Sequence, residues 1–268
     1  MSYAVKARWT SRFGKAALVA VSAAALTVGL AGSASAGVLT PLAESTTTFQ
    51  KAFQPYFDYD TDSCFPAAAI DASGALNGGL SPTGSITGGC RTDHLGKANT
   101  YSRAKCDSSS GWCGIVYTLY FEKDQAIAGS SLGGHRHDWE SVVVWVKQGA
   151  SQPSYVSASA HGDFDTQAVS AVPMNGAHVE IVYHKDGALT HAFRFAKSGE
   201  TPEAWGDGGW DTPALVSWDH FPGSNGTALQ TTLNNSSWGS ANFMIQDSKF
   251  GDTLNEAKPS AITFDAYA

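Results

Sequence analysis

The hydrophobic pattern of the chain is built from short apolar stretches with the length of β-strands. The clearest is residues 115–121, Ile-Val-Tyr-Thr-Leu-Tyr-Phe, whose aromatic and β-branched side chains predict a strand. Similar stretches follow at residues 141–147, 155–160, 178–183 and 191–195, with Gly, Pro, Asn or Asp in the turns between them. No helical pattern of roughly 10–15 residues separates them, which disfavours parallel βαβ units. The pattern therefore predicts a mainly β protein, an antiparallel β-sandwich with a few short helices and long loops.

Outside these stretches the pattern predicts short helices and loops. Residues 37–52 carry apolar side chains at near-helical spacing, and residues 227–233 and 252–258 are further candidate helices, the last ended by Pro259. Residues 60–100 are rich in Gly, Ser, Thr, Asp and Pro and show little periodicity, and residues 199–213 contain Gly-Asp-Gly-Gly-Trp. Both regions are expected to be loops, the first long enough to need a disulfide to hold it. The chain contains no internal repeat.

The first 36 residues have the pattern of a secretory leader. A basic start is followed by an apolar run at residues 16–31 and by Ala34-Ser35-Ala36, which is typical of a signal peptidase site. A membrane anchor is the weaker interpretation, because the run is shorter than the roughly 20 residues that span a bilayer. We predict a signal peptide over residues 1–36, a secreted product, and one domain over residues 37–268. No transmembrane segment is expected in that domain.

Removal of the leader makes the protein more acidic. The leader holds four of the 17 basic residues and none of the 24 acidic ones, so the net charge changes from −7 to −11. An acidic protein is not drawn to nucleic acid or to anionic lipid by charge alone. The composition therefore argues against nucleic acid as a partner.

Four cysteines lie in the first third of the secreted domain: Cys64, Cys90, Cys106 and Cys113. An even number in an exported protein predicts two disulfides. Three pairings are compatible with the sequence, and we favour the neighbour pairing, Cys64–Cys90 with Cys106–Cys113, which closes two short loops. A zinc site is disfavoured, because no Cys-x-x-Cys or matched His spacing accompanies these residues.

Charged and imidazole side chains are concentrated just before the predicted strand at residues 141–147, in the heptapeptide Gly134-His135-Arg136-His137-Asp138-Trp139-Glu140. Side chains alternate along a strand, so Asp138 and Glu140 share a face, and His135 joins them only if the segment bends. Asp124 ends the preceding predicted strand and would lie beside this segment in a hairpin. Carboxylate oxygens favour hard cations, so we predict a Ca²⁺ or Mg²⁺ site. The alternative is a solvated hairpin end with ion pairs between Arg136 and the two carboxylates.

An enzyme is a second interpretation of the same residues. His-x-His followed by Glu is similar to the metal motif of cupins, although the Glu comes sooner here, and His161 could add a ligand. Such coordination would imply redox or hydrolytic chemistry. Paired glycosidase acids remain possible, because the separation of the carboxylates in space is unknown. Nucleophilic catalysis has no support, since no Gly-x-Ser-x-Gly sequence is present.

The heptapeptide resembles the signature of the necrosis- and ethylene-inducing peptide 1-like proteins, the NPP1 family. Other segments agree with that family, so the resemblance covers essentially the whole secreted domain. They are Cys64-Phe65-Pro66-Ala67-Ala68, residues 70–74 (Ile-Asp-Ala-Ser-Gly), Gly78-Gly79-Leu80, Gly88-Gly89-Cys90, residues 157–162, Leu215-Val216-Ser217-Trp218-Asp219 and Trp238-Gly239-Ser240-Ala241-Asn242. Four cysteines resemble the members with a second disulfide.

The resemblance implies a monomeric β-sandwich similar to actinoporins and some fungal lectins. It also implies a cytolysin that binds glycosyl inositol phosphoceramide sphingolipids of plant plasma membranes with the help of a divalent cation. By position, Asp124 and Asp138 would ligate the ion, while His135, Glu140 and His191 would line its cavity. The remaining assignments from the resemblance are His161, Trp218 and Asp219 as ligand-binding residues and Gly134, Arg136, His137 and Trp139 as structural supports.

One loop departs from the family pattern. Many cytotoxic members have an aromatic residue just before the histidine matched by His191, whereas residues 185–190 of this chain read Lys-Asp-Gly-Ala-Leu-Thr. The absence of the aromatic puts membrane insertion or headgroup specificity in question. A carbohydrate-binding module without lytic action is therefore a third interpretation, beside the cytolysin and the metal-dependent enzyme.

Overall fold

The structure is a computed structural model that describes Met1, residues 38–203 and residues 208–268. The predicted signal peptide, residues 1–36, lies outside this described part apart from Met1. None of the helices in the described ranges has the length and hydrophobicity that crossing a bilayer requires.

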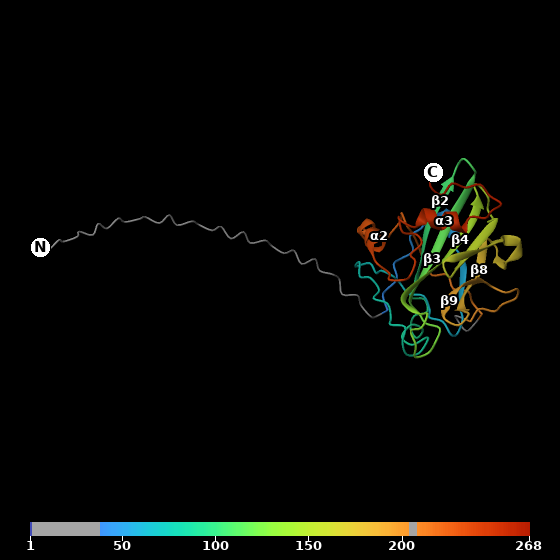
Figure 1. Cartoon of the computed structure of the whole chain (residues 1–268). Helices are drawn as coiled ribbons and strands as arrows, with labels where there is room; N and C mark the ends of the chain where they lie inside the picture. The colour runs from blue at the N-terminus through green and yellow to red at the C-terminus, as the bar shows by residue number, and fades with distance from the viewer. Residues whose placement is uncertain (2–37, 204–207) are drawn as a thin grey trace. The chain divides into compact units, whose positions relative to one another are not determined.

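The larger of two sheets contains six strands in the order β10-β2-β3-β4-β5-β6 (Figure 1). The central hairpin of this sheet is β3 paired with β4, and the two strands stay in one register along their length. The strands are β2 (Asn99–Asp107), β3 (Trp112–Asp124), β4 (His135–Lys147), β5 (Tyr155–Ala160), β6 (Asp163–Ala168) and β10 (Ala214–Ser217).

The smaller sheet is centred on β8, which pairs with β1, β7 and β9. Its strands are β1 (Tyr56–Tyr59), β7 (Met174–Asn175), β8 (His178–Asp186) and β9 (Thr190–Phe195), and the 3-10 helix η1 (Val169–Ala171) precedes β7. Most strand pairs are antiparallel, while β10 pairs with β2 and β1 with β8 in parallel. The predicted mainly β sandwich is confirmed, with these two parallel pairs as an addition.

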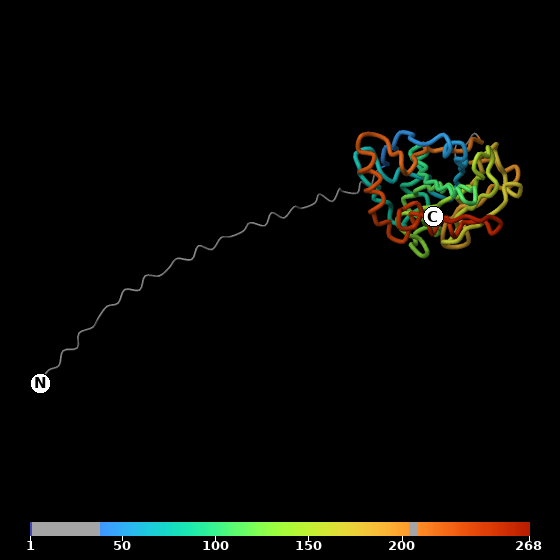
Figure 2. Tube along the Cα trace, turned by 90° about the horizontal axis from the view of Figure 1, so that it is seen from above, coloured from blue at the N-terminus to red at the C-terminus, as the bar shows by residue number. Residues whose placement is uncertain are grey.

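The larger sheet is buried on both faces, which explains why its central strands read as nearly continuous apolar runs. Ile115 and Tyr117 belong to a cluster that includes Ile181 of β8, so this cluster fills the space between the sheets. Val116 belongs to a second cluster that includes Leu254 of α3 (Phe250–Ala257). In Figure 2 the blue segment around residue 50 and the red C-terminal segment lie on opposite sides of the green strands.

Two of the three predicted helices form as expected. Residues 227–233 lie in α2 (Gly226–Asn235), and α3 ends just before Lys258, whose backbone is extended because Pro259 follows. The helix predicted over residues 37–52 is reduced to α1 (Thr48–Lys51). The segment before α1 is extended instead, because Ser45 bridges to Val216 of β10.

The disulfide pairing is confirmed. Cys64 is bonded to Cys90 and Cys106 to Cys113. The first bond closes the long region before β2, which has isolated bridges but no regular strand or helix between residues 60 and 98. The second joins β2 to β3 at directly opposed positions.

Candidate functional site

Residues 135–140 of the heptapeptide form the first half of β4, and the backbone bends at His137. That residue has a φ of 59°, in the left-handed region that few non-glycine residues adopt. Because the bend interrupts the alternation of side chains, His135 lines the same cavity as Asp138 and Glu140. In an unbroken strand His135 would face away from these carboxylates.

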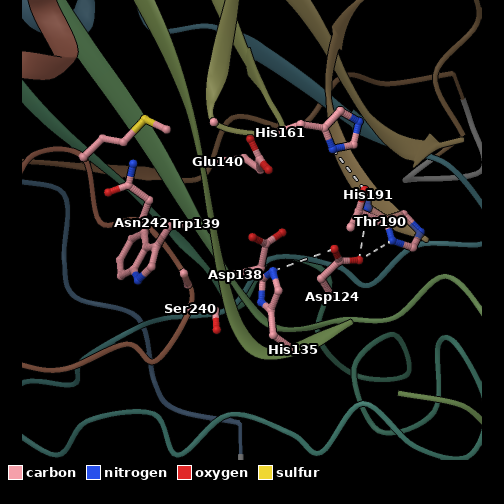
Figure 3. A pocket seen from close by; sticks show the side chains of 13 residues that line it. Asp124, His135, Asp138, Trp139, Glu140, His161, Thr190, His191, Ser240 and Asn242 are labelled. Atoms are coloured by element: carbon pink, nitrogen blue, oxygen red, sulfur yellow. Dashed lines mark hydrogen bonds and ion pairs between the residues drawn. The ribbon is translucent and has the colours of Figure 1, made fainter. Parts of the chain in front are cut away.

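The heptapeptide contributes to a cavity of about 290 Å³ at the end of the sandwich, which we call the acidic cavity (Figure 3). Four parts of the chain converge on it: the β3–β4 hairpin, the turn after β5, the start of β9, and the segment between α2 and α3. The lining residues are Asp124, His135, Asp138, Trp139, Glu140, His161, Gly162, Thr190, His191, Ser240, Ala241, Asn242 and Met244.

Asp124 is held in place by His191 of β9. Its Oδ1 accepts a hydrogen bond from the backbone N–H of His191 at 3.0 Å and lies 2.8 Å from Nδ1 of that ring. Nε2 of His191 faces the carbonyl oxygen of Asp62 at 3.2 Å. Both ring nitrogens of His191 thus face oxygen acceptors, so the ring donates to Asp124 and presents no free lone pair to the cavity.

His135 has the opposite arrangement. Its Nδ1 donates to the carbonyl oxygen of His137 at 2.6 Å, since a carbonyl can only accept. Its Nε2 lies 4.0 Å from Oδ2 of Asp124. In the neutral imidazole this second nitrogen is an acceptor directed toward the carboxylates, where it can bind a water or a hydroxyl group.

Asp138 and Glu140 are buried on the face of β4 that points toward the smaller sheet. Tyr183 of β8 donates its hydroxyl to Oδ2 of Asp138 at 2.7 Å, and Ser159 of β5 donates to Glu140. Burial, together with the charge of Asp124, raises the pKa of Asp138 to about 6. Burial and then the charge of Asp138 raise the pKa of Glu140 well above its usual value.

Asp124 and Asp138 are the oxygen donors that could hold a hard cation. The pKa of Asp138 is raised first by burial and then by the charge of Asp124, so a bound cation would favour the ionised form of this carboxylate. Within the described ranges, however, no three His, Cys, Asp or Glu side chains converge as a ready-made ligand set. A cation bound by the two aspartates would therefore keep several of its own waters, as Mg²⁺ commonly does.

His161 stands at the rim of the acidic cavity, with a φ of 54°. Its Nε2 lies 2.7 Å from Oδ2 of Asp186, and its Nδ1 lies 3.1 Å from the hydroxyl of Thr190. The ring thereby links the turn after β5 to the β8–β9 hairpin. The structure thus places His161 beside the predicted metal residues.

Trp218 and Asp219 are not brought to the acidic cavity. Trp218 is buried against Phe221 and Phe243 beneath α2, and together with Asp219 it lines a separate small hollow. The resemblance of this segment to the family block reflects its place in the aromatic core. Among the described residues, no contact connects these two residues to the acidic cavity.

The other heptapeptide residues support the bend. A Cβ atom on Gly134 would lie 2.5 Å from the carbonyl oxygen of Asp124, so only glycine fits. Arg136 donates to the carbonyl oxygens of Gly78 and Gly79 at 2.9 Å each. Trp139 packs into the aromatic cluster on the far face of β4.

Several residues of the site were not found by sequence reasoning. Tyr183 and Ser159 hold the buried carboxylates from other strands. Ser159 had only the family resemblance of residues 157–162 as a sign, and Tyr183 had none beyond its strand pattern. Ser240 and Asn242 line the cavity on the side away from Asp124 (Figure 3). Their only sign was the family resemblance of the segment that contains them.

Comparison with a family model matches residues 47–257 to "Necrosis inducing protein (NPP1)". The chain is similar to NLP effector protein 10 of Phytophthora capsici, with 34% identity over 81% of this chain and 86% of that protein. It is also similar to the necrosis-inducing protein NPP1 of Phytophthora nicotianae, with 33% identity over 85% of this chain and 92% of that protein.

Solved structures of similar fold include NLPPya in complex with mannosamine, with a TM-score of 0.68 and 27% identity over 82% of this chain and 97% of that one. A structure described as a toxin fold for microbial attack and plant defense has a TM-score of 0.68 and 28% identity over 83% and 97%. The non-toxic HaNLP3 protein is as similar, with a TM-score of 0.67 and 30% identity over 82% and 97%. Relatives of this fold thus include both toxic and non-toxic proteins.

Proposed function

This chain belongs to the necrosis inducing protein (NPP1) family, and from that premise we propose that it is a secreted, cation-dependent cytolysin. Relatives are named as toxins and effector proteins rather than as enzymes. We propose that its target is the sugar headgroup of plant glycosyl inositol phosphoceramide, recognised at the acidic cavity. Secretion is supported by the two disulfides, which persist in oxidising compartments.

The observation that carries this proposal is the pair of carboxylates, Asp124 and Asp138, that face one cavity, where Asp138 is buried and has its pKa raised. In our proposal the two carboxylates hold Ca²⁺ or Mg²⁺ together with its retained waters. His135 and Glu140 line the same cavity and would act through those waters. The part of His191 would be to orient Asp124, since both of its ring nitrogens already face oxygen atoms.

A cation in this cavity would give sugar hydroxyls a charged partner. The opening also carries Thr190, Ser240 and Asn242, whose side chains can donate and accept hydrogen bonds. One similar structure is a complex with mannosamine and another is a complex with glucosamine. These complexes support a sugar as a ligand of this chain, and we propose that it binds at the acidic cavity.

A second candidate function is sugar binding without lysis. The loop before His191 lacks an aromatic residue, and the exposed apolar side chain there is Leu189, at 39%. The non-toxic HaNLP3 is as similar in fold as the toxic relatives. Binding and lysis must therefore be measured separately.

The test uses purified secreted-form protein and vesicles that contain glycosyl inositol phosphoceramide. Cosedimentation measures binding and dye release measures lysis, each with Ca²⁺, with Mg²⁺ or with a chelator. The test variant is Asp138→Asn, and the matched control is Glu256→Gln, which removes one negative charge from an exposed position of α3.

We expect cation-dependent binding and dye release for the wild type and for Glu256→Gln, and neither for Asp138→Asn. Binding without dye release would establish the non-lytic function. Equal binding by the wild type and Asp138→Asn would refute the proposed role of this cavity. Stoichiometric iron, manganese or zinc in the purified protein would favour the metal-dependent enzyme.

A further inference from the structure

A second hollow adjoins the acidic cavity. It is formed by one continuous segment between α2 and α3, which we call the 236–249 hollow. Three residues, Ser240, Ala241 and Asn242, line both the hollow and the acidic cavity. The remaining lining residues are Ser236, Ser237, Trp238, Gly239, Phe243, Gln246 and Lys249. The hollow and the cavity are therefore neighbours that share this wall.

The polar side chains of the hollow have unused hydrogen-bonding capacity. Ser237, Ser240, Asn242 and Lys249 are exposed, and their side chains make no hydrogen bond or ion pair with the described residues. Together they offer hydroxyl, amide and ammonium groups within one hollow. Such a set suits a hydroxyl-rich ligand such as a saccharide.

The wall of the hollow is rigid, because it rests on the aromatic core. Trp238 is buried and contacts the rings of Tyr120, His137 and Trp139 at centroid distances of 5.3, 5.2 and 5.3 Å. The segment that follows is fixed by Gln246, whose side chain donates to the carbonyl oxygen of Asn234 at 2.6 Å. Polar groups held by a packed scaffold bind a ligand with little loss of conformational entropy.

The charge of the hollow is opposite to that of the acidic cavity. Lys249 is the one charged residue among those that line the hollow, whereas Asp124, Asp138 and Glu140 all line the cavity. In a ligand that spans both, an anionic group would be repelled by the carboxylates if it lay in the cavity. The same group would be attracted by Lys249 if it lay in the hollow. The pattern therefore selects for the position of an anionic substituent.

We propose that the 236–249 hollow is a second saccharide subsite, which binds an anionic sugar unit next to the sugar held at the acidic cavity. Lys249 would pair with a carboxylate or phosphate group, and Asn242 on the shared wall would contact both units. This inference rests on the proposed function, since it assumes that the acidic cavity binds a sugar.

Calorimetric titration of the purified protein in Ca²⁺ tests the subsite. The probes are glucosamine, a hexose–glucosamine disaccharide, a uronic acid–glucosamine disaccharide and a phosphohexose–glucosamine disaccharide. The last two probes distinguish a carboxylate from a phosphate as the preferred anion. The variants are Lys249→Gln, Lys249→Arg and the control Lys97→Gln, an exposed lysine that lines neither the cavity nor the hollow.

We expect the wild type to bind one of the two anionic probes about fivefold more tightly than the hexose–glucosamine disaccharide, as one exposed ion pair allows. Lys249→Gln should lose this preference and keep its affinity for glucosamine, whereas Lys249→Arg and Lys97→Gln should keep both. We expect the Lys249 variants to fold like the wild type, because the side chain of Lys249 makes no capping hydrogen bond to α3.

The outcomes separate the two proposals. An unchanged preference in Lys249→Gln, or no preference in the wild type, would overturn the subsite while leaving the acidic cavity intact. Binding of anionic probes through Lys249 without any binding of glucosamine would support the subsite and contradict the sugar site at the cavity. If the wild type bound none of the probes, both proposals would be wrong.

Discussion

Replacement of Asp138 by Asn should stabilise the cation-free protein, although it removes a residue of the proposed site. The carboxylate is 5% exposed, and its pKa is raised from 3.8 to about 6, first by burial and then by the charge of Asp124. Each pKa unit corresponds to about 1.4 kcal/mol, so the ionised carboxylate costs the folded state about 3 kcal/mol at neutral pH. The Asn side chain keeps an oxygen that can accept from Tyr183. For a domain of this size we expect a Tm increase of roughly 5–10 °C.

The pH dependence follows from the direction of the shift. A carboxyl with a raised pKa holds its proton more tightly when folded than when unfolded, so stability falls as pH rises through this range. The advantage of Asp138→Asn should be complete above about pH 6, the folded pKa, and absent below about pH 4. Added Ca²⁺ should reverse the order at neutral pH, because the proposed site would bind it in the wild type and not in the variant.

Differential scanning calorimetry at pH 7.5 and at pH 4, in chelator and in Ca²⁺, measures these effects. Glu256→Gln serves as the control and should show neither the stabilisation nor a changed response to Ca²⁺. If Asp138→Asn were less stable than the wild type in chelator at pH 7.5, the cost inferred for the buried carboxylate would be wrong. An equal increase in Tm on adding Ca²⁺ to both proteins would place the cation elsewhere.

Three further predictions test the scaffold of the site. Tyr183→Phe removes the hydroxyl that donates to Asp138. It should lower the free energy of unfolding by about 1.5–3 kcal/mol at pH 7.5 and by less at pH 5. Equal losses at both pH values in urea titrations would contradict this prediction. His137→Val should be less stable than His137→Asn by about 1–2 kcal/mol, since Asn tolerates the left-handed backbone; equal urea midpoints would argue against the bend. Gly133→Ala places a Cβ 2.5 Å from the Cβ of Leu189, at a φ of 75°. We expect it to lower the free energy of unfolding by about 1–3 kcal/mol in the same urea titration. An unchanged urea midpoint would show that the two loops move apart freely.

Local patterns along the chain were enough to predict the central strands. The stretches at residues 115–121 and 141–147 fall within β3 and β4, because a strand buried on both faces must be almost entirely apolar. Strands β1, β2, β6, β7 and β10 were not predicted. Of these, β1, β7 and β10 are short, and β1 and β10 are specified by parallel partners distant in sequence. Strands β2 and β6 are largely polar and so lack an apolar pattern.

The heptapeptide shows most clearly what the sequence determined by itself. It concentrates carboxylates and imidazoles at the start of a strand, and it resembles the family signature and lines the acidic cavity. Alternation along the strand correctly gave Asp138 and Glu140 a common face. These properties depend on residue types and spacing within one hairpin, which the chain carries locally.

Only the tertiary structure decided how the site is completed. The left-handed backbone at His137 brings His135 to the cavity, and it is stabilised by packing that no local pattern reveals. Asp124 is oriented by His191 from the other sheet, and Asp138 is held by Tyr183 from β8. The physical reason is that a buried charge needs partners wherever the fold can supply them, and in a β-sandwich those partners come from strands far apart in the chain.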